Sequence, residues 1–204
     1  MNLIESMAYL YAIPSNSSQQ KSLPTNLELF SRISSPDEQK CNKTKFQALV
    51  GSLLFIARMT RPDVAIHVNL LGWLAEDPSA INFQAATKVL TYLLSTKSEG
   101  VIIRRPSNLQ LEAFADASYG DPEARSQTGV LMTMGQQPVG WYSRRQDILC
   151  LSITEAEYVA DCKGVKDLAW GRQLLGELQV SDSTPILWTN SEGAKNLSQM
   201  TRFI

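Results

Sequence analysis

The feature that most constrains this chain is a change in the spacing of its apolar residues near residue 100. Before this point, apolar residues recur every three or four positions, as on one face of an amphipathic helix. After it, they alternate with polar residues, as in half-buried strands. The change predicts a helical segment followed by a domain that is built on a sheet.

The helical part is predicted to contain three helices between about residues 43 and 95. The first break falls at residues 60–63, where Pro62 suits the first turn of the next helix. The second break falls at residues 77–79, with Ser79 as the N-cap of the third helix. Residues 14–40 are rich in Ser, Pro, Asn and Gln, which predicts a flexible lead-in over residues 1–42.

The second part is predicted to be a mixed α/β domain. Its hairpin signal is Gly135-Gln136, and a long helix is expected from Ser152 to about Leu178, with a break near Gly164. A short helix is expected at residues 191–197. The predicted strands are residues 101–104, 109–116, 128–134, 137–143 and 185–190. Together with the helices, they indicate a mixed sheet with packed helices, and domains at residues 43–98 and 99–204.

Composition excludes several classes of function. The formal net charge of the 204 residues is −1, so a nucleic-acid-binding protein would have to gather its basic groups locally. The chain has three cysteines without a C-x-x-C spacing and one histidine, His67, which argues against disulfide frameworks, zinc knuckles and His-based sites. The most apolar run, residues 48–57, is too short to span a bilayer, and no signal peptide or membrane association is expected.

Glu157 is a candidate site residue on pattern alone. At helical spacing it shares a stripe with Ile153, Ala160 and Gly164, which is otherwise small and apolar. A carboxylate on a packing face is costly unless it is paired or binds a metal. Asp116 ends a predicted strand and could converge with Glu157.

The start of this helix can be interpreted in two ways. Ser152 as the N-cap puts Glu155 at the third helical position and leaves Glu157 facing the sheet. With Thr154 as the N-cap, Glu157 would instead take the third helical position and would only help to cap the helix. The first interpretation is preferred, because a helix that begins nearer Ser152 leaves Glu157 facing the sheet.

Five motifs in fixed order resemble those of copia-type retrotransposon Pol polyproteins, from the tail of the reverse transcriptase into the ribonuclease H domain. They cover about residues 43–200, and the ordered set is more specific than any single member. The motifs are residues 46–76 (FQALVGSLLFIARMTRPDVAIHVNLLGWLAE), 114–118 (FADAS), 125–129 (RSQTG), 141–146 (WYSRRQ) and 152–160 (SITEAEYVA).

This resemblance implies a ribonuclease H-like fold and hydrolysis of the RNA strand in RNA–DNA hybrids. The family uses four carboxylates that hold two magnesium (or manganese) ions. Two hard cations suit this reaction because negative charge develops on both the attacking and the leaving oxygen. The resemblance includes no polymerase motif, so polymerase activity is not expected.

Carried over residue by residue, the resemblance assigns Asp116 and Glu157 as metal ligands. The third position, in residues 187–194 (LWTNSEGA), holds Asn190 where the family has Asp. In the family the fourth Asp follows a segment like residues 201–204. The fold is therefore expected to be truncated at its carboxy-terminal side, with the last predicted strand as an exposed edge of the sheet. Glu192 is a weak candidate as a substitute ligand, and a solvated position is favoured for it.

Other polar and aromatic residues have competing interpretations. Arg125, Arg144, Arg145 and Gln146 are candidate nucleic-acid contacts, although a solvated hairpin end is an equal alternative for the arginine pair. Core positions are favoured for Trp141 and Trp188 over base stacking. His67 is expected to be structural, and Asp161 and Glu112 are expected on a solvated face rather than as partners of the metal ligands.

Three functions therefore remain open. The first is a ribonuclease H-type hydrolase that is impaired by the missing carboxylates. The second is a module that binds RNA–DNA hybrid without cutting it, and the third is an inert structural remnant of a Pol polyprotein. The expected partners are the hybrid and the rest of Pol, and the expected location is cytoplasmic, ancestrally in virus-like particles, with the nucleus as the alternative.

Overall fold

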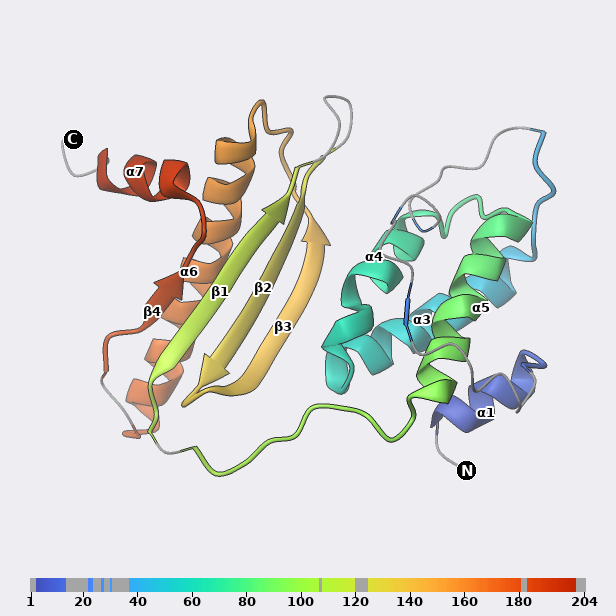
Figure 1. The fold of residues 1–204 in the computed structure, drawn as a ribbon, viewed down its shortest axis with the longest axis horizontal. Coiled ribbons are helices and arrows are strands. Elements are labelled where there is room, and N and C mark those ends of the chain that lie inside the picture. The colour runs from blue at the N-terminus through green and yellow to red at the C-terminus, as the bar shows by residue number, and fades with distance from the viewer. Residues whose placement is uncertain are drawn as a thin grey trace. The chain divides into compact units, whose positions relative to one another are not determined.

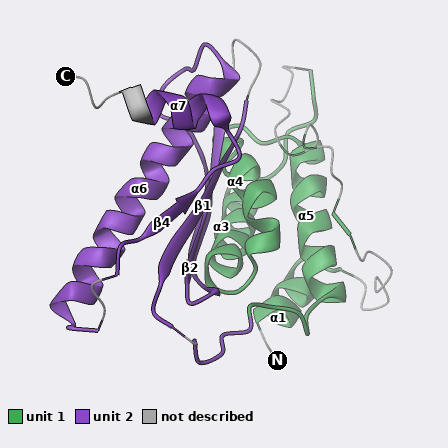
Figure 2. Ribbon diagram, turned by 60° about the vertical axis from the view of Figure 1, so that its left-hand side comes forward, with its two compact units in different colours: residues 1–101 green, residues 102–204 purple. Residues whose placement is uncertain are grey.

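The structure is a computed structural model that describes residues 3–13, 22, 23, 27, 30, 37–106, 108–119, 125–180 and 183–200. It divides into two compact units, Met1–Val101 and Ile102–Ile204 (Figure 2). Each unit has its own buried apolar residues. No helix in the described residues is long and apolar enough to cross a membrane.

The first unit is helical (Figure 1), and the three predicted helices are confirmed. Asn42 caps the first of them by accepting a hydrogen bond from the Lys45 amide at 2.9 Å. Ser79 is the N-cap of the third, as predicted, and forms a capping box with Asn82. The elements are α1 (Leu3–Leu10), α3 (Lys43–Met59), the 3-10 helix η1 (Pro62–Val64), α4 (Ala65–Trp73) and α5 (Ala80–Ser95).

An ion pair between a buried arginine and a partly exposed aspartate holds the break between α3 and α4 in place. The Arg61 side chain is almost fully buried and donates to both carboxylate oxygens of Asp63, at 2.9 and 2.7 Å. It also donates to the carbonyl and the hydroxyl of Thr96 at the end of α5. Tyr92 donates its hydroxyl to Asp63 at 2.8 Å. These bonds connect η1 to the last turn of α5, which explains why an arginine can be buried here.

The expected flexible lead-in is corrected for the part of it that the structure describes. Residues 3–10 form α1, and Met7 is buried in the core of the helical unit. Phe30 is fully buried and contacts the His67 ring edge-on, with the ring centroids 4.7 Å apart. The polar composition of residues 14–40 did not predict these contacts, because they depend on a few apolar side chains such as Met7 and Phe30. Most of residues 14–36 lie outside the described residues.

The second unit is a four-stranded mixed sheet with the order β3-β2-β1-β4. Strand β1 is antiparallel to β2, β2 is antiparallel to β3, and β4 is parallel to β1. The elements are β1 (Leu111–Ser118), β2 (Gln127–Met134), β3 (Gln137–Arg145), α6 (Ile153–Glu177), β4 (Ile186–Trp188) and α7 (Glu192–Met200). The fold class is therefore as expected: mixed α/β, with a ribonuclease H-like order of strands and helices.

The predicted strand at residues 101–104 is wrong. This segment is an extended connection, and Ile102 and Ile103 are 69% and 71% exposed. The Arg104 amide donates to the Gln137 side chain rather than to a neighbouring strand. A short run of residues that favour strands forms one only where a partner strand is available for pairing.

Helix α6 packs on one face of the sheet and begins as the preferred interpretation predicts. Ser152 is the N-cap, and its hydroxyl accepts from the Glu155 amide at 3.1 Å. The helix continues to Glu177 without the predicted break at Gly164. A Cβ at Gly164 would lie 2.8 Å from Leu187 Cδ1, so the glycine allows helix and sheet to approach closely.

Candidate functional site

The candidate site lies where β1 and β4 end. Asp116 is exposed near the end of β1, on the opposite face from the buried Ala113 and Ala115. Because β4 runs parallel to β1, the chain leaving β4 passes beside Asp116. Asn190 lies in this segment, and its Nδ2 donates to Asp116 Oδ1 at 3.3 Å. The structure thus brings these two sequence-predicted residues together.

Glu157 joins the site from α6. It is 7% exposed, and its Oε2 accepts a hydrogen bond from the Ala117 amide, next to Asp116, at 3.1 Å. Burial raises the pKa of Glu157, the negative charges of Asp116 and Asp161 raise it further, and the Ala117 bond lowers it. The stripe that nominated Glu157 is buried except for Ile153, which is 62% exposed. Strand β1, helix α6 and the segment after β4 therefore place Asp116, Glu157 and Asn190 in one region.

Sequence reasoning placed Asp161 on a solvated face, and the structure corrects this. Asp161 lies one helical turn beyond Glu157 and is only 8% exposed. Burial raises its pKa, and a hydrogen bond with the Thr189 side chain lowers it. Its Oδ1 is buried and has no hydrogen-bond partner among the described residues. The signal was available in principle, because Asp161 follows Glu157 at i+4 and so extends the same face of α6.

The expected two-ion metal site does not fit the residues that are present. In the part of the chain that the structure describes, no three Asp, Glu, His or Cys side chains lie close enough to hold a metal ion. At the Asn190 position, a hydrogen-bond donor faces Asp116 where the resemblance expects an anionic ligand. Glu192 has the solvated position that was favoured for it: its side chain is exposed, and its Oε1 lies 3.8 Å from Lys195 Nζ. It therefore does not replace the missing anionic ligand.

Two of the candidate arginines lie at the same end of the sheet as Asp116. The register aligns Arg144 and Arg145, through β2, with Ala117 and Ser118 of β1. Both side chains are exposed. Two strand spacings separate β3 from β1, a distance of about 10 Å. By this register Arg145 shares the face of the sheet that holds Asp116, whereas Arg144 lies over the Tyr142 ring on the other face.

The assignment of Gln146 as a nucleic-acid contact is corrected. Its side chain is 2% exposed and donates to the Thr128 hydroxyl and to the Ala156 carbonyl. It also accepts from the Cys150 thiol. These bonds tie the end of the hairpin to the start of α6, which is a structural role. Arg125 is exposed, as a contact residue must be.

The core position favoured for Trp188 is also wrong. Its side chain is 50% exposed and stacks on Phe114, with the ring centroids 6.2 Å apart and the planes 11° from parallel. Its indole nitrogen donates to Glu112 at 3.1 Å. The pair lies on the face of the sheet that α6 does not cover. The short strand β4 ends the described sheet, so its side chains are less enclosed than those of a central strand.

The fold and the site together define a class: a ribonuclease H-like domain with carboxylates at the ends of β1 and near the start of α6. No family model matches the chain. Curated relatives are the retrovirus-related Pol polyproteins from transposon RE1 of Arabidopsis thaliana (32% identical) and from transposon TNT 1-94 of Nicotiana tabacum (31% identical). The matches cover 76% and 81% of this chain but only 11% and 13% of those polyproteins. The chain belongs to the family of retrovirus-related Pol polyproteins of copia-type transposons.

Two further matches differ in kind. The protein named secreted RxLR effector protein 161 of Plasmopara viticola is 35% identical over 127 residues, which are 61% of this chain and 89% of that protein. Among solved structures, the foamy viral protease-reverse transcriptase in complex with dsDNA matches 87% of this chain and 35% of its own. Its TM-score is 0.39 and its sequence identity 14%.

Proposed function

We propose that the chain is the reverse transcriptase tail and ribonuclease H part of a copia-type Pol polyprotein, with an impaired ability to hydrolyse RNA in RNA–DNA hybrids. The observation that carries this proposal is the 3.3 Å contact from the Asn190 amide to Asp116. In the resembled family an Asp occupies this position. The ancestral partners are the hybrid and the rest of Pol, and the ancestral cofactor is a pair of magnesium or manganese ions.

The impairment follows from charge. Two hard cations near a phosphodiester are stabilised by anionic oxygen ligands. Replacing one Asp by Asn removes a full negative charge, and the amide hydrogen bond occupies an oxygen of Asp116 as well. Even the loss of groups that only support metal ligands costs roughly 10–100-fold. The loss of a ligand's charge is expected to cost more.

A gel assay with end-labelled RNA in an RNA–DNA hybrid tests the proposal. With magnesium or manganese, the chain is expected to cut no faster than its Asp116→Asn variant. Robust cleavage that disappears in Asp116→Asn would contradict the impairment. Recovery of cleavage in Asn190→Asp would identify the amide as the cause.

Binding of hybrid without cleavage is the second candidate function, because exposed Arg144 and Arg145 lie at the same end of the sheet as Asp116. Arginine suits phosphate oxygens through paired hydrogen bonds. Affinity that rests on such contacts falls as salt concentration rises, because bound counterions are released. Because the net charge of the chain is only −1, this salt dependence is expected to come from Arg144 and Arg145 and not from the chain as a whole.

A fluorescence anisotropy titration of labelled hybrid tests this candidate at two salt concentrations. The variant with both Arg144→Glu and Arg145→Glu is expected to bind at least about tenfold more weakly and with a reduced salt slope. Arg172→Glu, on the exposed side of α6, is the matched control and is expected to change little. Equal effects of both variants would show only a general loss of positive charge.

A further inference from the structure

Strand β4 forms an open edge of the sheet. It pairs with β1 on one side, and no strand of the described residues pairs with its other side. An edge strand presents unpaired backbone N–H and C=O groups along its outer side. Two of its side chains are also partly open to solvent, since Ile186 is 40% and Trp188 50% exposed. The edge of β4 is therefore able to accept one more strand.

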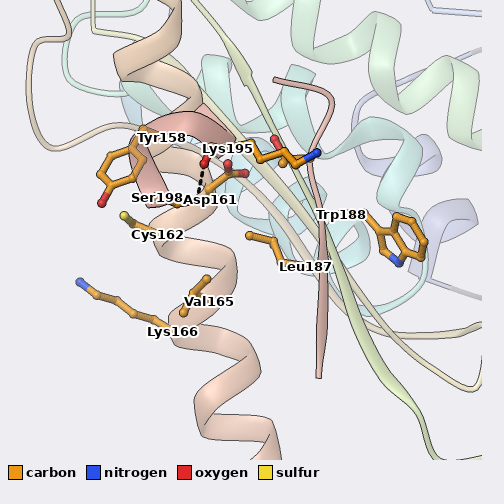
Figure 3. A pocket seen from close by; sticks show the side chains of 10 residues that line it. Tyr158, Asp161, Cys162, Val165, Lys166, Leu187, Trp188, Lys195 and Ser198 are labelled. Atoms are coloured by element: carbon orange, nitrogen blue, oxygen red, sulfur yellow. Dashed lines mark hydrogen bonds between the residues drawn. The ribbon is translucent and has the colours of Figure 1, made fainter. Parts of the chain in front are cut away.

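A groove runs beside this edge. Two cavities, with volumes of about 750 Å³ and about 560 Å³, lie between α6 and β4, and residues of α7 also line the first of them. Val165 and Leu187 line both cavities, so the two adjoin. In Figure 3, the side chains of Val165 and Leu187 point toward each other, whereas the Trp188 ring points away. We call the two cavities together the β4 groove; its lining includes Tyr158, Val165, Lys166, Arg172, Leu187 and Lys195.

The length of the β4 groove suits a short extended peptide. Its lining residues on α6 run from Tyr158 to Gln173, a rise of about 22 Å along the helix. A strand of about six or seven residues has this length. Beside β4, alternate side chains of such a strand would enter the groove over Leu187, and the others would lie next to Ile186 and Trp188. Both sets of side chains would meet apolar neighbours.

The β4 groove is positively charged. Lys166, Arg172 and Lys195 line it, and Asp161 is the one carboxylate among its described lining residues. Asp161 is 8% exposed, so it adds little negative charge to the surface of the groove. Lys195 is 56% exposed and lies 3.8 Å from Glu192, which is a weak contact at this exposure. Because complementary charge governs the choice of partner, the groove favours an acidic segment.

The opposite edge of the sheet is protected against such pairing. Strand β3 contains Pro138, which has no backbone N–H to donate. Its register with β2 also shifts, because Met132 pairs with Gly140 and Thr133 with Pro138, which leaves a bulge at Val139. Proline, bulges and charged side chains are the usual means by which edge strands avoid a further strand. The three residues of β4, Ile-Leu-Trp, include none of these features.

We propose that the β4 groove binds an extended, acidic segment of another polypeptide chain, with apolar residues at alternate positions. The segment adds a strand to β4, and its apolar side chains fill the space beside Val165 and Leu187. In this mode of recognition, backbone hydrogen bonds give affinity and pockets for alternate side chains give specificity. A second copy of this chain is a poorer occupant, because it would bring its own Lys166 and Lys195 to the same interface. The inference does not depend on whether the chain binds or cuts hybrid.

Fluorescence anisotropy of a labelled peptide, titrated with the full chain, tests the inference. The probe is a synthetic peptide of about six residues, in which valine alternates with threonine and glutamate stands at both ends. It is expected to bind. Two comparison peptides, one with lysine in place of glutamate and one with N-methylated amides, are expected to bind at least about tenfold more weakly. Failure of the acidic peptide to bind, or equal binding of either comparison peptide, would overturn the inference.

A substitution in the lining of the groove gives a second test. Val165→Glu is expected to weaken binding of the acidic peptide at least about tenfold, because it places a carboxylate on the apolar side of the groove. Val165 is 52% exposed, so the fold is expected to tolerate this change. The matched control is Val139→Glu on β3, which is 45% exposed and is expected to leave affinity unchanged. An equal loss in both variants would contradict the assignment to β4.

Hydrogen exchange locates the bound peptide without any variant. Saturating peptide is expected to slow the exchange of the β4 amides and to leave β3 and the helical unit unchanged. Slower exchange in β3 instead would show that the peptide adds to the other edge, which rejects the proposal. Sedimentation of the chain without peptide is expected to show single copies. A dimer that Val165→Glu dissociates would assign the groove to a second copy and would likewise reject it.

Discussion

Arg61 is a buried charged residue of the helical unit: its side chain is 3% exposed, and it forms an ion pair with the Asp63 carboxylate. We predict that Asp63→Asn lowers the free energy of unfolding of this unit by about 2 kcal/mol. The figure lies below that for a fully buried pair, since the Asp63 side chain is 40% exposed. Urea unfolding followed by circular dichroism measures it.

Asp77→Asn is the matched control for this prediction. It removes the carboxylate of another ion pair, with Lys40, in which both side chains are at least 40% exposed. Exposed pairs contribute little, so a change of at most about 0.5 kcal/mol is expected. Equal losses in the two variants would mean that burial of Arg61 does not matter.

The same pair gives a pH dependence. Burial raises the pKa of Asp63, but the hydrogen bonds from Arg61 and Tyr92 lower it by more, so the net pKa lies below its ordinary value of 3.8. A lowered folded-state pKa stabilises the fold above the ordinary value, and this stability is lost as pH falls through the lowered pKa. We predict that the Asp63→Asn penalty is full at pH 7 and shrinks below pH 3.8.

Glu157 is predicted to behave in the opposite way. Its folded-state pKa is raised by burial and by two neighbouring carboxylates, so its ionisation destabilises the fold as pH rises above the ordinary 4.5. In metal-free buffer, Glu157→Gln is therefore expected to raise Tm at pH 7 and to leave it unchanged well below pH 4.5. A lower Tm for the variant at pH 7 would show that the charged form is stabilised by a group that the structure does not describe.

At this scale, the sequence identified the residues that depend on local pattern. Asp116 and Glu157 were found because strand ends and helix stripes follow from spacing. Gln146 and Asp161 were misjudged because their burial depends on packing between segments far apart in the chain. From local sequence alone, a polar side chain is predicted to be exposed, because the segments that cover it are not known.

At the scale of the element, alanine substitutions at two glycines of α6 separate the effect of packing from that of helix propensity. A Cβ at Gly164 would lie 2.8 Å from Leu187 Cδ1 and 3.4 Å from Ala115 Cβ, whereas one at Gly176 meets nothing within 4 Å. We predict that Gly164→Ala lowers the unfolding free energy by about 1 kcal/mol or more, and that Gly176→Ala raises it by about 0.5–1 kcal/mol. Chemical unfolding of both variants tests the pair. Stabilisation by both would mean that the Leu187 side chain can move away from α6 at no cost.

Elements with strong local signals were predictable. The β2–β3 hairpin and the Ser152 cap were found because turn and capping residues act over a few positions. The strand at residues 101–104 was not, because pairing depends on a partner that local sequence does not specify. Helix α1 was missed because the polar stretch that follows it dominated the composition.

At the scale of the whole molecule, each unit carries its own core, so we predict separable unfolding. In the full chain, Asp63→Asn is expected to increase hydrogen exchange in α3, η1 and α5 without affecting β1–β3. Gly164→Ala is expected to do the reverse. Mass spectrometry of peptides from the exchanged chain measures both. Loss of protection across the whole chain in either variant would show one cooperative unit instead.

The most direct test of the central claim is single-turnover cleavage of an RNA–DNA hybrid at a chain concentration that binds all of it, with magnesium or manganese present. Our account predicts a cleavage rate that is indistinguishable from that of Asp116→Asn, because the Asn190 amide faces Asp116 where the family has a carboxylate. A rate well above that of Asp116→Asn would contradict the account.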